Sequence, residues 1–191
     1  MKESSSLTAS QVTPVAGEPV RWAVLVRFGE VALKKGHRQL FMGVLRRNIE
    51  RALAGLPVER VAIRPNRCFV WLEDAAAWPE VRERLANVFG IVGYSLCLRV
   101  PPTLEAARQA YHLLVATPPA SFAVRAHRGD KSFPLTSQEI ERELGAYIKD
   151  ASGSRVDLTH PQLTFYVELQ PEGIFCSTEQ VPGPGGLPVG T

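Results

Sequence analysis

The sequence lacks the long apolar run that a membrane helix or a secretion signal needs. No stretch of about 18 consecutive apolar residues occurs among the 191 residues. The first 19 residues are polar and contain no apolar core of a signal peptide. These absences exclude a transmembrane helix, and we expect a flexible tail over residues 1–19.

Cysteine is scarce, and its spacing is uninformative. The three cysteines are Cys68, Cys97 and Cys176, with no CxxC pair and only four dispersed histidines in the chain. This usage argues against a disulfide framework or a zinc site. Each cysteine lies in an apolar, strand-like stretch, which favours a buried, reduced thiol over a catalytic one. We therefore expect a cytoplasmic protein.

Motifs for autonomous catalysis are also missing. The chain has no GxxxxGK(S/T) loop, no GxGxxG before a helix, no SGGxDS-like ATP pyrophosphatase loop and no GxSxG elbow. We therefore predict no catalytic residue, cofactor or metal in this chain. Hydrophobic residues make up 45% of it, which is enough for a packed core.

The net charge of +3 conceals an uneven distribution. Residues 21–67 contain 11 lysines and arginines against 3 acidic residues, a net charge of +8. The rest of the chain has 11 basic and 16 acidic residues, a net charge of −5. A concentrated basic block suggests a polyanionic partner such as a nucleic acid. An ordinary solvated surface remains the alternative.

Residues 20–100 alternate between strand and helix patterns. Apolar positions recur at spacings of three and four in two segments, including Leu40, Phe41, Val44 and Leu45 in the first and Phe89 at the end of the second. The predicted elements are a strand at 20–28, a helix at 37–54, a hairpin of 58–64 and 67–72, a helix at 78–89 and a strand at 91–100. Their βαββαβ order is that of a ferredoxin-like domain.

Pro101 and Pro102 mark a boundary, and residues 101–181 predict a second, α/β domain. A helix follows them, with Thr103 as its N-cap. In the strand at 121–128, alternation predicts one buried face and one polar face. A helix at 138–150 and strands at 163–169 and 174–178 complete this domain. The fold class is therefore α+β, and the Gly- and Pro-rich residues 182–191 have the composition of a linker.

The segment from Arg125 to Tyr147 is the first candidate binding site. Arg125 lies on the polar face of its strand, and Arg128 and Lys131 follow towards the next helix. Backbone N–H groups at a helix start attract phosphates, and three cations converging there predict a phosphate site.

The start of that helix also permits a purely structural interpretation. Thr136 or Ser137 is placed to cap the helix. A capped helix beside a solvated loop is an equally good interpretation, and Asp130 would then pair with Lys131 or Arg128.

The first helix provides the second candidate site. Lys34, Lys35 and Arg38 crowd its start, and Arg46 and Arg47 continue along it. Cations at a helix N-terminus oppose the helix dipole. A bound anion would relieve that conflict, although a basic helix without a ligand remains the alternative.

Several stretches together resemble the N-terminal half of bacterial tRNA 4-thiouridine synthetase, a tRNA sulfurtransferase. They are RFGEVALKKGHR at 27–38, FGIVGYSLC at 89–97, RAHRGDKSFPLTSQEIERELGAYI at 125–148 and TEQVPGPGGLPVGT at 178–191. The resemblance covers about residues 21–191. It implies a ferredoxin-like domain, a THUMP domain that binds the tRNA acceptor end, and then an ATP pyrophosphatase domain.

In that family the pyrophosphatase domain adenylates a uridine, and a persulfide cysteine loaded by a cysteine desulfurase supplies the sulfur. Some members also serve thiamine thiazole synthesis. This sequence stops where the family's ATP-binding loop would begin, so ATP and Mg²⁺ are expected only in the missing domain. The resemblance implies a tRNA-holding module that contacts the acceptor stem and 3′ end, and a homodimer. A protein-interaction module without RNA binding is the alternative.

Overall fold

The computed structural model describes residues 20–29, 35–65 and 67–190, so the tail predicted over residues 1–19 lies outside the described part. The chain divides into two compact units. In the described residues, the first comprises 22–96 and 180–190, and the second includes 97–179. None of the helices in these ranges is both long and apolar enough to cross a bilayer.

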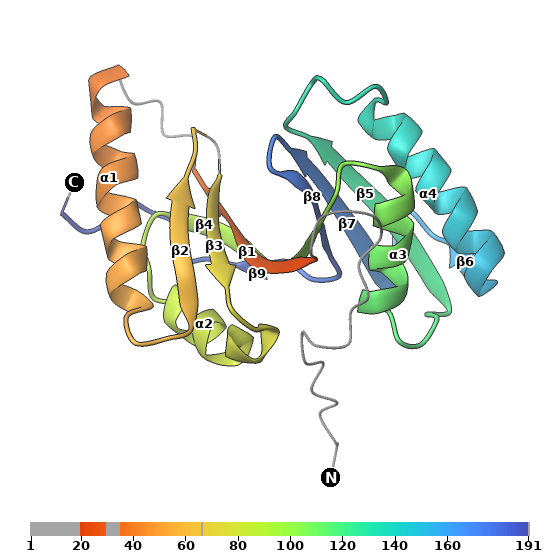
Figure 1. Ribbon diagram of the computed structural model, residues 1–191, viewed down its shortest axis with the longest axis horizontal. Coiled ribbons are helices and arrows are strands. Elements are labelled where there is room, and N and C mark those ends of the chain that lie inside the picture. The colour runs from red at the N-terminus through yellow and green to blue at the C-terminus, as the bar shows by residue number, and fades with distance from the viewer. Residues whose placement is uncertain (1–19, 30–34, 66, 191) are drawn as a thin grey trace, which may run out of the picture. The chain divides into compact units, whose positions relative to one another are not determined.

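The first unit has the predicted βαββαβ order (Figure 1). Its elements are β1 (Arg21–Phe28), α1 (Lys35–Ala52), β2 (Val58–Ile63), β3 (Cys68–Leu72), a short 3₁₀ helix (Ala75–Ala77), α2 (Trp78–Leu85) and β4 (Ile91–Val100). The strand order is β2-β3-β1-β4, and both β2 and β1 run antiparallel to β3. The ferredoxin-like prediction is therefore confirmed.

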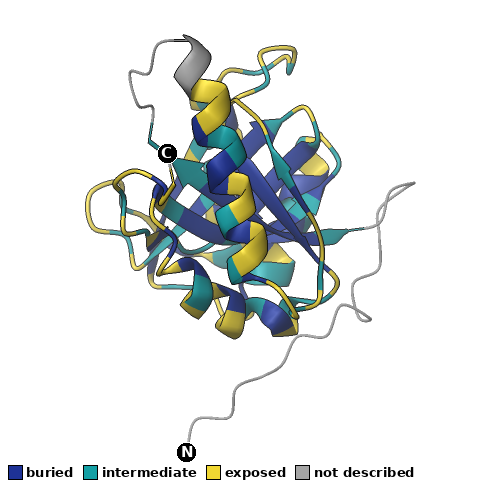
Figure 2. Ribbon diagram, turned by 90° about the vertical axis from the view of Figure 1, so that its left-hand side faces the viewer, coloured by how far each residue is buried: buried dark blue, intermediate teal, exposed yellow. Residues whose placement is uncertain are grey.

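Helix α1 packs one face against the sheet and presents the other to solvent, as Figure 2 shows. Phe41, Val44, Leu45 and Ile49 are buried at spacings of three and four. Leu40 was expected in this apolar face but is 55% exposed. It lies one turn before Val44, at the edge of the buried stripe, which explains the error.

Helix α2 ends earlier than the periodicity predicted. It stops at Leu85, and the N–H of the next residue, Ala86, donates to the carbonyl oxygens of Arg82 and Arg84. The chain then bends towards Gly90, whose φ of +98° is a left-handed conformation that favours glycine. This bend leaves Phe89 51% exposed rather than part of a helical apolar face.

The C-terminal segment, predicted as a linker, lies against the first unit. Strand β9 (Val181–Pro182) pairs antiparallel with β4. The N–H of Gly185 then donates to the carbonyl of Ile91 (2.7 Å), and Asn48 Nδ2 donates to the carbonyl of Val189 (3.0 Å). Composition alone does not reveal such contacts, because they are made to residues roughly 90 to 140 positions away in the sequence.

The second unit is built around a strand pair that runs parallel. Its elements are α3 (Leu104–Leu114), β5 (Ser121–Arg128), α4 (Ser137–Ser152), β6 (Arg155–Val156), β7 (Leu163–Gln170) and β8 (Gly173–Ser177). β5 and β7 are parallel, β7 and β8 are antiparallel, and the last residues of β4 pair with β8. Helix α4 packs on β5 and against α3. The two-residue strand β6 was not predicted.

Strand β5 departs from the predicted alternation. Residues 121–124 are all buried, with Ala123 as inaccessible as Phe122, and the strand alternates only from Arg125 onward. The first half of β5 pairs with β7 on one side and β6 on the other. An internal strand of this kind is typically covered on both faces, so the period-2 rule does not apply there.

Arg84 links α2 to the end of α1. Its Nη1 donates to the carbonyls of Ala52 (3.1 Å) and Ala54 (2.9 Å), and its Nη2 pairs with Glu80 (2.5 Å). We expect Arg84→Met, which keeps the aliphatic stem, to lower the free energy of unfolding by about 1–2 kcal/mol because the helix-end carbonyls lose a charged donor. Urea denaturation measures this, with Glu83→Met on the same helix as control. Equal stability of the two variants would show that Arg84 does not secure α1.

Candidate nucleic-acid interface

The loop between β5 and α4, residues 129–136, is organised by Arg128. Its Nη1 donates to the carbonyl oxygens of Phe133 (3.2 Å) and Leu135 (3.1 Å). Both acceptors are neutral, so the guanidinium keeps its full positive charge. The structure therefore gives Arg128 a structural role and leaves its charge available to an anion.

The start of the loop is tied to the sheet and to itself. The N–H groups of Gly129 and Asp130 both donate to the carbonyl of Leu169 on β7, at 2.8 and 3.1 Å. The Asp130 carboxylate accepts the N–H of Ser132 (2.8 Å). Hydrogen bonds from Ser132 lower the pKa of Asp130, with a smaller contribution from Arg128. Within the described residues Asp130 forms no ion pair, so the exposed Lys131 keeps its charge.

The start of α4 is closed by a capping box, and the cap is Thr136 rather than Ser137. Thr136 Oγ1 accepts the N–H of Glu139 (3.3 Å), while the Glu139 carboxylate accepts the N–H of Thr136 (2.7 Å). The bonds from Thr136 lower the pKa of Glu139. A negative charge therefore already occupies this helix start, and Arg142 and Arg128 are the positive groups that act on it.

The side chain of Arg125 does not contact the basic loop but the segment after β6. Its Nη2 donates to the carbonyl of Leu158 (2.6 Å), in the segment after β6. The structure thus brings Arg128, Lys131 and Thr136 together at the loop, and it places Arg125 at a pocket described next.

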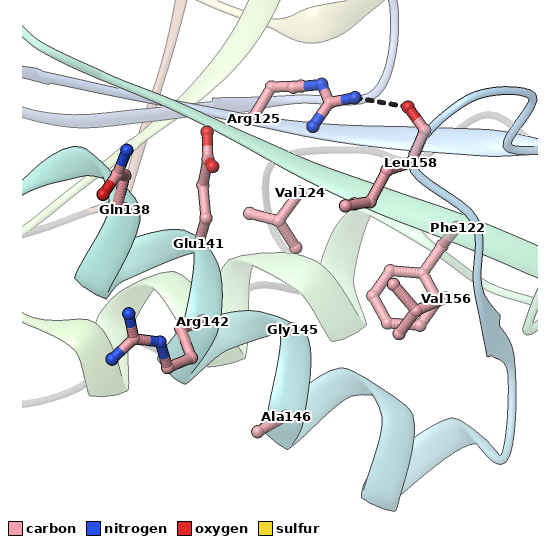
Figure 3. Close-up of a pocket in the computed structure, with 10 residues that line it drawn as sticks. All are labelled: Phe122, Val124, Arg125, Gln138, Glu141, Arg142, Gly145, Ala146, Val156 and Leu158. Carbon is pink, nitrogen blue, oxygen red and sulfur yellow. Dashed lines mark hydrogen bonds between the residues drawn. The ribbon is translucent and has the colours of Figure 1, made fainter.

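A pocket of about 310 Å³ lies between α4 and the edge of β5 (Figure 3). One face of α4 lines it at helical spacing, with Gln138, Glu141 and Arg142 followed by Gly145 and Ala146. Opposite them lie the apolar side chains of Phe122, Val124, Val156 and Leu158, and Arg125 stands at the rim. The sequence prediction missed this pocket, although a glycine in mid-helix was an available signal.

Glu141 connects the two walls of the pocket. Its Oε1 accepts the N–H of Ala126 (2.9 Å). β6 pairs with β5 only at Ser121 and Phe122, so the edge of β5 is open beyond that point. The side chain of Glu141 replaces the missing strand partner, and it leaves its second oxygen at the pocket.

In the first unit, the predicted basic residues are only partly gathered. Lys34 lies outside the described residues, as does the side chain of Lys35. Arg38 Nη2 donates to the carbonyl of Pro65 (2.6 Å) in the β2–β3 turn. Arg46 pairs with Glu50 (2.8 Å), whereas Arg47, one residue further, is exposed.

The β2–β3 turn adds two arginines that the sequence analysis counted but did not single out. Arg64 and Arg67 flank Pro65, and the N–H of Arg64 donates to the carbonyl of Arg67 (2.7 Å). Because Arg38 reaches the same turn, three guanidinium groups belong to this end of the first unit. The turn is a candidate part of the interface because Arg38 of α1 reaches it in space, which the sequence does not reveal.

Comparison with known proteins assigns both units to families. Residues 23–95 match the family model described as the ThiI ferredoxin-like domain. Residues 104–179 match the THUMP domain. The chain contains a ThiI ferredoxin-like domain followed by a THUMP domain. The resemblance inferred from the sequence is therefore confirmed, and the basic loop and the pocket both lie within the THUMP domain.

Relatives and solved structures agree with this assignment. The chain is 45% identical to a probable tRNA sulfurtransferase of Moorella thermoacetica over 170 residues, which are 88% of this chain and 43% of the relative. It is 39% identical to that of Thermus thermophilus, covering 85% and 40% of the two chains. The chain thus spans less than half the length of these relatives.

Two solved structures share the fold and are about 30% identical to this chain in sequence. Pyrococcus horikoshii PH1313 superposes with a TM-score of 0.80 at 31% identity, covering 88% of this chain and 57% of that one. A 4-thiouridine synthetase in complex with RNA and bound ATP gives 0.74 at 30% identity, covering 89% and 44%.

Neither thiols nor metal ligands form a reactive cluster in the described part of the two domains. Cys68, Cys97 and Cys176 are free and buried, as predicted. Burial raises the pKa of Cys68 to about 12 and that of Cys176 well above its usual value. The thiols of Cys68 and Cys176 are therefore protonated at neutral pH and are poor nucleophiles. Among the described residues, no three His, Cys, Asp or Glu side chains gather as metal ligands.

The capping box should contribute to the stability of the THUMP domain. We expect Thr136→Ala to lower the free energy of unfolding by about 1 kcal/mol, since the first turn of α4 loses its side-chain acceptor. Thr136→Ser keeps the hydroxyl and should restore most of the loss. Urea denaturation of the three proteins measures this, and an unchanged midpoint for Thr136→Ala would contradict the assigned cap.

Proposed function

We propose that the chain binds tRNA and holds its acceptor end for uridine thiolation, as the RNA-holding part of a tRNA 4-thiouridine synthetase. The observation that carries this proposal is the basic loop of the THUMP domain, where Arg128 and Lys131 lie beside the start of α4. The likeness to tRNA sulfurtransferases, and to a 4-thiouridine synthetase solved with RNA, supports it.

Within this proposal, the loop contacts the phosphates of the 3′ end. Arg128 holds the loop in shape through Phe133 and Leu135, while Lys131 is exposed near its tip. Thr136 caps the start of α4 next to it, and Ser137 is the first residue of that helix. Arginine and lysine contacts to phosphate position an RNA without reading its sequence, which suits the recognition of a tRNA end by shape.

The first unit is the proposed track for the acceptor stem. Arg38, Arg46 and Arg47 lie along α1, and Lys34 and Lys35 precede them in the sequence. Arg47 is a clearer phosphate ligand than Arg46, because the charge of Arg46 is already paired with that of Glu50.

Thiolation itself is assigned to sequence beyond these two domains. The relatives are more than twice as long as this chain. We place ATP, Mg²⁺ and the sulfur received from a cysteine desulfurase in that additional part. The burial of Cys68, Cys97 and Cys176 supports placing the sulfur carrier there as well.

Binding to tRNA is tested most directly at Lys131. We expect Lys131→Ala to weaken tRNA binding and to reduce the slope of log K against log salt concentration by about 0.7–0.9, the value for one lost phosphate contact. Lys149→Ala, at the other end of α4, is the matched control and should change neither. Filter binding over a range of salt concentrations measures both. If Lys131→Ala leaves the slope unchanged, Lys131 does not contact phosphate.

A paired test separates the arginines of α1. We expect Arg47→Ala to weaken tRNA binding more than Arg46→Ala, because Glu50 already neutralises Arg46. The same salt titration measures both variants, and their melting temperatures serve as the stability control. An equal or reversed order would remove α1 from the proposed track.

A homodimerisation module is the second candidate function, favoured by exposed apolar side chains in the first unit. Phe89, Val92, Leu187 and Val189 are more than half exposed, and so is Leu40. Sedimentation of the protein with and without tRNA distinguishes the two functions. A stable dimer that leaves tRNA unbound supports this second candidate, whereas a complex with tRNA supports the first.

A further inference from the structure

The end of strand β7 holds the start of the basic loop at two points. The carbonyl oxygen of Leu169 accepts the N–H of Gly129 (2.8 Å), and the side chain of Gln170 lies against the same glycine. We propose that Glu168 and Gln170 are positioning residues, which hold the basic loop in the shape that brings Lys131 to a phosphate. This inference rests on the proposed tRNA binding and adds two residues that carry no positive charge.

Gly129 leaves the space that the side chain of Gln170 occupies. A Cβ on Gly129 would lie 2.5 Å from Gln170 Nε2 and 2.8 Å from its Cδ and Oε1 atoms. Gly129 is not among the glycines with a positive φ, so its backbone conformation does not require a glycine. The close approach of Gln170 therefore accounts for a glycine at this position.

Glu168 holds the amide of Gln170 in this place. Gln170 Nε2 donates to Glu168 Oε1 (2.9 Å), and His127 Nδ1 on the neighbouring strand β5 lies 3.8 Å from the same oxygen. Among the charged side chains in the described ranges, that of Glu168 is the one that is buried, and the residue is 5% exposed. Burying a carboxylate costs free energy unless it is paired or hydrogen-bonded. A role in holding Gln170 explains why a buried acid occurs here.

The rest of the loop is fixed on both sides of Lys131. Before it, the carboxylate of Asp130 accepts the N–H of Ser132 (2.8 Å). After it, Arg128 binds two backbone carbonyls at the far end of the loop. A segment that is ordered before it binds loses less conformational freedom on binding. The contact of Gln170 with the loop start therefore lowers the entropic cost of bringing Lys131 to a phosphate.

The salt dependence of tRNA binding tests this role, because Gln170 is uncharged and can change it only by positioning a cation. We expect Gln170→Met to weaken binding by roughly three- to tenfold, the worth of one hydrogen bond. The slope of log K against log salt concentration should fall by about 0.7–0.9, the value for one lost phosphate contact. Gln162→Met is the matched control at the opposite end of β7, where the Gln162 amide oxygen accepts the N–H of Ala120 (2.6 Å). It should leave the slope unchanged.

The same filter-binding titration in a Lys131→Ala background shows whether Gln170 acts through that lysine. Adding Gln170→Met there should have little further effect, since two changes that remove one contact are not additive. If the full loss recurs, or if Gln170→Met alone binds as wild type, the positioning role is overturned and tRNA binding stands. If Lys131→Ala itself leaves the slope unchanged, the positioning role falls although tRNA binds. If no tRNA binds, both proposals fall.

Substitutions at Glu168 separate the hydrogen bond from general support of the fold. Glu168→Gln keeps an oxygen that can accept the amide of Gln170, and it should bind tRNA with nearly the wild-type affinity and slope. Glu168→Leu removes the acceptor and should resemble Gln170→Met. Equal losses in the two Glu168 variants would overturn the assignment of Glu168. Thermal melting of each variant confirms that it is folded at the temperature of the binding assay.

Gly129→Ala tests the contact from the side of the loop. The added Cβ would displace the side chain of Gln170, so this variant should also resemble Gln170→Met. Wild-type affinity and slope in Gly129→Ala would show that Gln170 is not held against the loop, and this result would overturn the inference.

Discussion

The side of the second unit that carries the pocket and the basic loop depends on one edge of strand β5, where most backbone groups have no neighbouring strand to pair with. β6 pairs with β5 at only two positions, so backbone groups beyond Phe122 need other partners. Buried backbone N–H groups are rarely left unpaired, and here Glu141 supplies the acceptor for Ala126 from a neighbouring helix. This bond fixes the distance between α4 and β5. The bond lies at the pocket beside them, whereas the capping box of Thr136 and Glu139 sets where α4 begins.

Several arginines hold backbone segments in place through hydrogen bonds and also carry positive charge at the surface. Arg128 shapes the basic loop, Arg125 holds the segment after β6, Arg38 reaches the β2–β3 turn and Arg84 closes the end of α1, each through backbone carbonyls. A guanidinium with five donors can bind a carbonyl and still present charge to a phosphate. Within the +8 block of residues 21–67, Arg38 supports the β2–β3 turn and Arg46 pairs with Glu50, so the net charge alone overstates the positive charge that is free to attract an anion.

Much of the fold followed from local pattern. The βαββαβ order and the burial of the three cysteines were correct from spacing and residue type, and the cap of α4 is one of the two predicted residues, Thr136 rather than Ser137. The errors occurred where a neighbouring segment determines exposure. Ala123 is buried although the alternation placed it on the polar face, and Phe89 is exposed because α2 ends at Leu85. Periodicity describes one element and carries no information about what covers it.

The sequence by itself determined the order of the elements, the start of α4 and the position of a basic loop before it. These features arise from residues within a few positions of each other, whose preferences are local. Only the tertiary structure decided which cations act together, because that depends on strand order. It joined Arg125 to Leu158, Arg38 to Pro65 and Glu141 to the open edge of β5. The pocket exists only through such contacts between residues that are distant in the chain.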